Sequence, residues 1–240
     1  MTSEQTGMLQ RSGKRLFFEH QEMDFYFSWV LGRHFYEGCD EQTCYDVAAR
    51  IVDGDAASWR AAWRRVAEET FAQANADLEA GLREEARIGF LHACTYYRAP
   101  LFIMGPSDEG FHDLAQRMRL SFQRAAALFG PPIEQVEVTY DGKQLPGYFW
   151  KVDDSGARRP TLIVIGGLET WAEDCYFFVG SAGPAAGFNV LTVDVPGQGF
   201  NPDQGLYLEA RMDLPMQAVV DYALTRPEVD PRQLALYGFS

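Results

Sequence analysis

The apolar pattern of the chain changes abruptly at Gly130-Pro131-Pro132, and this change constrains the fold more than any other feature. From about residue 23 to residue 130, apolar residues recur at spacings of three and four, which is typical of amphipathic helices. Beyond that point they alternate or form short runs between turns, which is typical of strands. Two consecutive prolines cannot continue a helix. We therefore predict a helical domain over residues 1–131 and a sheet-containing domain over residues 132–240.

The first half is expected to contain five helices. Their predicted ranges are 22–37, 41–52, 56–80, 82–103 and 110–129. Aromatic residues are denser here than a helical core requires, and most are expected to pack in that core. We expect a few of them, Tyr96 and Tyr97 in particular, to line a pocket for an aromatic or extended apolar substrate.

The second half is expected to open with an antiparallel ribbon and to continue as a parallel sheet. Asp141-Gly142 predicts a hairpin turn between strands at 136–140 and 145–152. Strands at 161–165, 189–194 and 233–237 alternate with helices at 172–186 and 212–225. The run Thr161–Ile165 is short and wholly apolar, as expected for a central strand buried on both faces. Alternating strands and helices predict an open parallel sheet with right-handed crossovers, and hence the α/β class.

Two loops at strand ends predict nucleophilic chemistry. Tyr237-Gly238-Phe239-Ser240 supplies the first three residues of a G-x-S-x-G nucleophile elbow, in which a strained turn lifts a serine hydroxyl clear of the sheet. Gly166-Gly167 directly follows the buried strand at 161–165, where a turn can aim a backbone N–H at a substrate oxygen. The order of these elements along the chain, more than either motif alone, favours a serine hydrolase.

A third loop, Asp194-Val195-Pro196-Gly197-Gln198-Gly199, is interpreted as structural. Proline and glycine are the residues that a tight turn needs, and Asp194 is expected to fix that turn through backbone N–H groups. The loop lacks the G-x-G-x-x-G order of a dinucleotide site and the G-K-S/T of a phosphate loop. No cofactor is therefore expected.

The base and the acid that a nucleophilic serine needs are not expected in this chain. In the α/β-hydrolase order both follow the serine, whereas the four histidines, His20, His34, His92 and His112, all precede the sheet. These histidines and the four cysteines show no metal-ligand spacing, so no metal is expected and the cysteines are interpreted as reduced thiols. We expect the chain alone to be catalytically inactive.

Composition narrows the range of partners. The formal net charge of −13, from 21 basic and 34 acidic residues, argues against binding to nucleic acid or to an anionic membrane surface. The sequence has no apolar run of the roughly 18 residues that span a bilayer. A cytoplasmic location is expected, with a small molecule as substrate.

The second half resembles the FrsA-like group of α/β-hydrolases with an N-terminal helical cap, a group that includes polyketide-shortening hydrolases. The segments that carry the resemblance are Gly166–Thr170, Glu173-Asp174, Tyr176–Phe178, Val190–Gly199, Val219–Tyr222, Arg226–Pro231 and Tyr237–Ser240. They cover residues 133–240 closely, whereas the helical half resembles the group only in general character.

The resemblance implies roles for individual residues. Ser240 matches the nucleophile, Gly167 and Leu168 match the oxyanion loop, and Glu169 to Glu173 match a loop that faces the cap. This gives Glu169, Trp171 and Glu173 as substrate-binding residues beside Tyr96 and Tyr97.

The resemblance also implies a fold and a reaction. The fold is the first half of an α/β-hydrolase sheet behind an all-helical cap, and we expect a second polypeptide to carry the remainder and the completed unit to form a homo-oligomer. The reaction is cleavage of an ester, an amide or a C–C bond next to a carbonyl, in a small aromatic or polyketide-like substrate, through an acyl-enzyme on Ser240. Two alternatives remain open: an acyltransferase or cyclase of natural-product biosynthesis on the same fold, and a non-catalytic binding scaffold.

Overall fold

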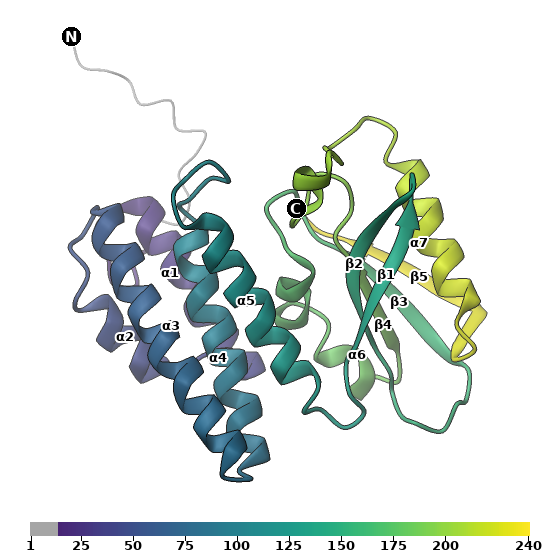
Figure 1. The fold of residues 1–240 in the computed structure, drawn as a ribbon, viewed down its shortest axis with the longest axis horizontal. Coiled ribbons are helices and arrows are strands. Elements are labelled where there is room, and N and C mark those ends of the chain that lie inside the picture. The colour runs from purple at the N-terminus through teal and green to yellow at the C-terminus, as the bar shows by residue number, and fades with distance from the viewer. Residues whose placement is uncertain (1–13) are drawn as a thin grey trace. The chain divides into compact units, whose positions relative to one another are not determined.

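The computed structural model describes residues 14–240, and these divide into two compact units between Phe122 and Gln123 (Figure 1). The first unit is helical. Its helices are α1 (Gln21–Gly32), α2 (Glu41–Ala48), α3 (Ala56–Glu79), α4 (Arg83–Leu101) and α5 (Phe111–Ala126), with a short 3-10 helix η1 (Arg33–Tyr36) after α1. The five predicted helices are therefore confirmed, with ends that differ by up to a turn or so. The last residues of α5 belong to the second unit, and the domain boundary predicted at residues 131–132 falls after this helix.

Polar side chains fix where several of these helices begin. Asp40 and Asp55 accept hydrogen bonds from the backbone N–H groups of Thr43 and Ala57, at the starts of α2 and α3. His20 does the same for Met23 at the start of α1, which gives one of the four histidines a structural role.

The core of the helical unit lies between α3 and α4. Trp59 and Trp63 of α3 are fully buried, and the Trp59 indole N–H donates to the Ala99 carbonyl of α4 at 2.9 Å. Further along, Gly89 of α4 lies so close to α3 that an added Cβ would be 2.9 Å from the Cβ of Ala74. Small residues at this point let the two backbones approach.

The second unit holds a five-stranded sheet with the order β1-β2-β4-β3-β5. The strands are β1 (Glu134–Tyr140), β2 (Lys143–Trp150), β3 (Arg159–Ile165), β4 (Asn189–Val193) and β5 (Val229–Gly238). β1, β2 and β4 are antiparallel neighbours, whereas β3 runs parallel to both β4 and β5. Asp141 and Gly142 turn the β1–β2 hairpin with φ of 50° and 71°, as predicted. A helical region followed by this mixed sheet confirms the predicted α/β class.

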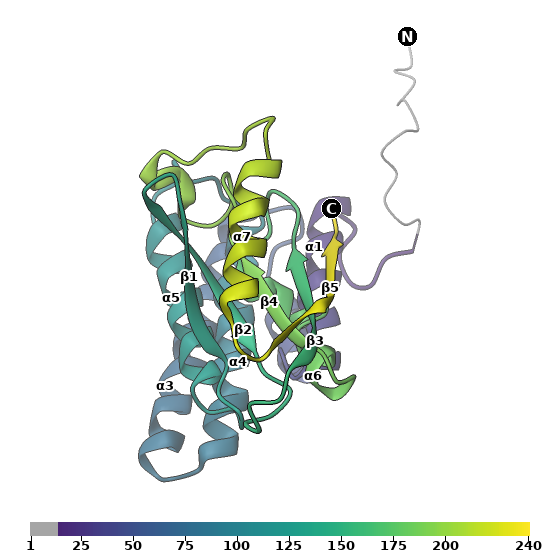
Figure 2. The same ribbon diagram turned by 90° about the vertical axis from the view of Figure 1, so that its right-hand side faces the viewer.

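Helical segments cover both faces of the sheet (Figure 2). On one face, Val219 and Ala223 of α7 (Asp213–Thr225) join a core that includes Phe149 of β2 and Leu191 of β4. On the other face lie a 3-10 helix, η2 (Ala172–Phe177), and a four-residue helix, α6 (Ala182–Ala185).

The single helix predicted at residues 172–186 is therefore wrong. Gly183 lies against β4, because an added Cβ would be 2.2 Å from a methyl carbon of Val190. Gly180 lies near Trp150 of β2, at 3.2 Å by the same measure. Both glycines permit close packing on the sheet, and glycine is also a poor helix former. The chain gains contact with the sheet at the expense of a continuous helix.

β5 lies at one edge of the sheet, and β3 is the one strand paired with it in the described part of the chain. Its Leu236 and Tyr237 side chains are 61% and 45% exposed. No helix within residues 14–240 has both the length and the apolar character that crossing a membrane requires.

Candidate active site

Three loops meet at the carboxyl edge of the parallel strands, where open α/β sheets bind their ligands. They follow β3 (residues 166–171), β4 (residues 194–200) and β5 (residues 239–240). Figure 1 shows the C-terminal residue at the end of β5.

The structure places Ser240 against Gly167. A Cβ added at Gly167 would lie 3.4 Å from the Ser240 Cα and 3.6 Å from the Phe239 carbonyl oxygen. The Phe239 N–H donates to the Ile165 carbonyl at 3.2 Å, so the pairing of β5 with β3 continues up to the residue before the serine. Ser240 itself is exposed.

The loop after β3 is a tight turn. The Thr170 N–H donates to the Gly167 carbonyl at 3.0 Å, and an added Cβ at Gly166 would be 2.3 Å from a methyl carbon of Thr170. Within the described residues, the backbone N–H groups of Gly167 and Leu168 donate no hydrogen bond. Two such N–H groups beside a serine are suited to hold a developing oxyanion.

The loop after β4 is bound to the loop after β3. The Gln198 side chain is 4% exposed, and its Nε2 donates to the carbonyl oxygens of both Gly166 and Gly167 at 2.7 Å. Its Oε1 accepts a hydrogen bond from the Val195 N–H at 3.0 Å. No pattern in the sequence pointed to Gln198, because its partners are more than 30 residues away and the surrounding proline and glycines already suit a simple turn.

The Asp194 carboxylate reaches beyond its own turn. It is fully buried and accepts a hydrogen bond from the Ala172 N–H at 2.7 Å, at the start of η2. The Asn201 side chain holds the turn, donating to the carbonyls of Asp194 and Val195 at 2.7 and 3.1 Å. Asp194 is thus a link between two strand-end loops.

The predicted substrate-binding residues of the sheet unit differ in exposure. Leu168 is 55% exposed and Glu169 is also exposed. Trp171 is buried, with its ring 4.9 Å from that of Phe200. Glu173 is fully buried, and its carboxylate accepts a hydrogen bond from the Tyr148 hydroxyl at 2.8 Å.

Tyr96 and Tyr97 are almost fully buried in the helical unit. The Tyr96 hydroxyl accepts a hydrogen bond from the Asp40 N–H at 3.1 Å, and its ring packs on Trp63. Burial raises the pKa of both phenols, so they remain neutral near pH 7. Their role in substrate binding remains a prediction.

Cys175 is not suited to act as a nucleophile. It lies in η2 and is buried. Burial raises the pKa of the Cys175 thiol, which keeps it protonated, and a thiol is far less nucleophilic than a thiolate. Among the described residues, no group of three or more His, Cys, Asp or Glu side chains is placed to hold a metal ion.

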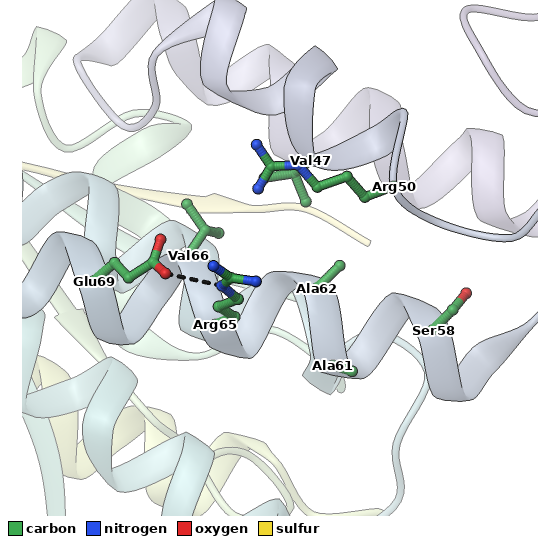
Figure 3. A pocket seen from close by; sticks show the side chains of 8 residues that line it. All are labelled: Val47, Arg50, Ser58, Ala61, Ala62, Arg65, Val66 and Glu69. Carbon is green, nitrogen blue, oxygen red and sulfur yellow. Dashed lines mark hydrogen bonds and ion pairs between the residues drawn. The ribbon is translucent and has the colours of Figure 1, made fainter.

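A cavity of about 290 Å³ lies between α2 and α3 in the helical unit (Figure 3). Val47, Ala62 and Val66 form part of its apolar lining, with Arg65 of α3 and Arg50 of the turn after α2. The one serine of its lining is Ser58, whose hydroxyl donates to the Asp55 carbonyl at 2.9 Å and accepts a hydrogen bond from the Val52 N–H at 3.0 Å, so it has a capping role. This cavity therefore lacks the features of a catalytic site.

Fold and loops together define an α/β-hydrolase: a helical region, a sheet with the order β1-β2-β4-β3-β5, and a Gly-Gly turn beside a serine. A sequence model of the family "Esterase FrsA-like" matches residues 24–240, and the chain belongs to this family.

Individual proteins agree with this assignment. The α/β hydrolase gkaG of Penicillium citrinum is 31% identical over 227 residues, which cover 90% of this chain and 53% of that protein. The α/β hydrolase ucsC of an Acremonium species is 30% identical over 236 residues, covering 90% of this chain and 48% of that protein. The chain thus spans about half the length of the curated relatives it matches. The crystal structure of 2,6-dihydroxy-pseudo-oxynicotine hydrolase has the same fold, with a TM-score of 0.75 at 23% identity over 86% of this chain and 57% of that one.

Proposed function

We propose that this chain supplies the nucleophile and the oxyanion loop of a serine hydrolase. The observation that carries the proposal is the position of Ser240 against Gly167, at the common edge of β3 and β5. In this proposal the Ser240 Oγ attacks a substrate carbonyl, and the N–H groups of Gly167 and Leu168 stabilise the negative charge that forms on the carbonyl oxygen.

The base that removes the serine proton would come from outside these 240 residues. The sheet unit contains no histidine, and the relatives are about twice as long as this chain. An acyl-enzyme on Ser240 would then form as the leaving group departs with a proton from that base, and water would release the product. The 240 residues alone would therefore be inactive.

A small aromatic or polyketide-like substrate fits the aromatic surface of the helical unit. Tyr26 stacks on Phe102 with their rings 5.4 Å apart, and Trp29 packs edge-on against Phe102 at 5.8 Å. Trp29 is 39% exposed. Rings of this kind bind flat or extended apolar molecules. The scissile bond would be an ester, an amide or a C–C bond next to a carbonyl.

The test is labelling with a fluorophosphonate, which reacts with activated serines, followed by intact-protein and peptide mass spectrometry. The protein isolated from the cells that make it should gain one phosphonyl group on Ser240, whether the rest of the hydrolase is on the same or on a second polypeptide. The Ser240→Ala variant should gain none. Labelling elsewhere, or none in the native protein, would rule out the proposed nucleophile.

A further inference from the structure

Gln198 joins two loops that the sequence keeps apart. It is almost fully buried, and its side chain makes three hydrogen bonds to backbone groups. One bond, from the Val195 N–H to Oε1, closes the turn that contains Gln198. The other two hydrogen bonds reach a different loop, because Nε2 donates to the carbonyl oxygens of the consecutive residues Gly166 and Gly167. If Gln198 only stabilised its own turn, the bond to Val195 would be explained, but the two bonds to the loop after β3 would not.

These two carbonyls determine where two N–H groups point. A trans peptide unit is planar, and its C=O and the following N–H lie on opposite sides. The Gly166 carbonyl is in one plane with the Gly167 N–H, and the Gly167 carbonyl with the Leu168 N–H. By holding both oxygens, Gln198 turns both N–H groups away from itself and fixes the orientation of the peptide planes beside Ser240.

The two glycines of the loop after β3 need another residue to hold their peptide planes in one orientation. Gly166 and Gly167 lack side chains that could hold their peptide planes, and glycine backbones have the largest conformational freedom. An oxyanion site is effective only when its donors are already oriented before the charge forms. The Gln198 carboxamide, itself held by Val195, provides that orientation from a neighbouring loop.

We propose that Gln198 is a positioning residue that sets the orientation of the oxyanion N–H groups of Gly167 and Leu168. This inference rests on the proposed serine hydrolase function. It gives the loop after β4 a part in the reaction, although Gln198 would touch neither the substrate nor Ser240.

The direct test uses the 240-residue chain and nuclear magnetic resonance. In the wild type, the two Nε2 protons of Gln198 should exchange with solvent much more slowly than those of Gln204, an exposed glutamine nearby. In Gln198→Glu, which keeps the acceptor and loses both donors, the carbonyl ¹³C resonances of Gly166 and Gly167 should move. Gln204→Glu changes a side chain that donates to the Gln144 carbonyl and to the Asn201 Oδ1 and makes no contact with Gly166 or Gly167, so it should leave their resonances in place. Fast exchange of the Gln198 protons in the wild type would overturn the inference without any variant.

The kinetic test uses the native hydrolase. Gln198→Glu should lower kcat, and the rate of phosphonylation of Ser240, by about 100-fold, with a much smaller change in KM, because the donors act on the transition state. Gln204→Glu should stay within about twofold of the wild type. Wild-type rates in Gln198→Glu would overturn the inference and leave the proposed function intact. An unreactive wild-type Ser240 would instead overturn the proposed function, while the carbonyl resonances would still decide whether Gln198 holds the loop.

Discussion

At the scale of single residues, His92 of α4 is a titratable side chain held largely away from water. Burial lowers the pKa of His92 to about 4, against the partly compensating charges of Asp40 and Glu37. The imidazole is therefore neutral in the folded protein at pH 5, whereas in the unfolded chain, with an ordinary pKa near 6.5, it is mostly protonated. Lowering the pH thus favours the unfolded chain.

This gives a prediction for the pH dependence of stability. The contribution of neutral His92 to the free energy of unfolding is complete above pH 6.5, roughly the pKa of histidine in the unfolded chain. It is lost as the pH falls toward about 4, the pKa of His92 in the folded protein. Between pH 7 and pH 5 the free energy of unfolding should fall by about 2 kcal/mol through this residue. Urea titrations followed by circular dichroism at 222 nm should show the loss in the wild type and much less of it in His92→Gln. An equal loss in both proteins would contradict a buried neutral His92.

The residues of the candidate site show which part of it a sequence can reveal. Ser240 and Gly167 belong to short motifs at strand ends, and the order of strands and helices between these motifs was enough to favour a serine hydrolase. The structure places the two residues side by side. Gln198 and Asp194 act through partners 22 to 32 residues away, on another loop. Nothing in their immediate neighbours encodes those partners, and so their contacts could be learned only from the fold.

At the scale of elements, most helices and strands were predictable because each has the apolar spacing of its type and ends at residues typical of turns. The five helices and the five strands lie where apolar spacing and the Asp-Gly turn indicated. The segment 172–186 failed because two glycines fit the sheet surface better than they fit a helix. Here tertiary packing outweighed the local pattern.

The crossing of α3 and α4 provides an element-scale prediction. An added Cβ at Gly89 would lie 2.9 Å from the Cβ of Ala74, so Gly89→Ala should force the helices apart and destabilise the helical unit by about 1–3 kcal/mol. Adding Ala74→Gly removes the clashing atom, and the double variant should recover more stability than the two single changes predict together. Urea titrations of the four proteins of this cycle measure the coupling. Additive effects would show that the helices do not meet at these two residues.

At the scale of the whole molecule, the free side of β5 favours self-association of the 240-residue chain. Exposed edge strands with apolar side chains pair readily with other chains, and Leu236 is 61% exposed. The net charge of −13 opposes association, so added salt should strengthen it by screening.

Sedimentation velocity at low and high salt measures this association. Leu236→Lys should weaken it, because a lysine on an edge strand disfavours pairing. Val52→Lys, at a residue that is 62% exposed in the helical unit, is the matched control and should have little effect. Equal effects of the two lysines would indicate a general charge effect and contradict association through β5.

The contacts of Gln198 have a consequence for how such an enzyme can change during evolution. The Gln198 side chain donates hydrogen bonds to backbone carbonyl oxygens, a group that every amino-acid residue has. These hydrogen bonds do not require a particular side chain at the next positions of the loop. Under the role proposed for Gln198, a change of side chain at Leu168 would leave both of these hydrogen bonds in place. Selection could then alter the choice of substrate through side chains of this loop, while the backbone groups proposed to hold the oxyanion keep their orientation.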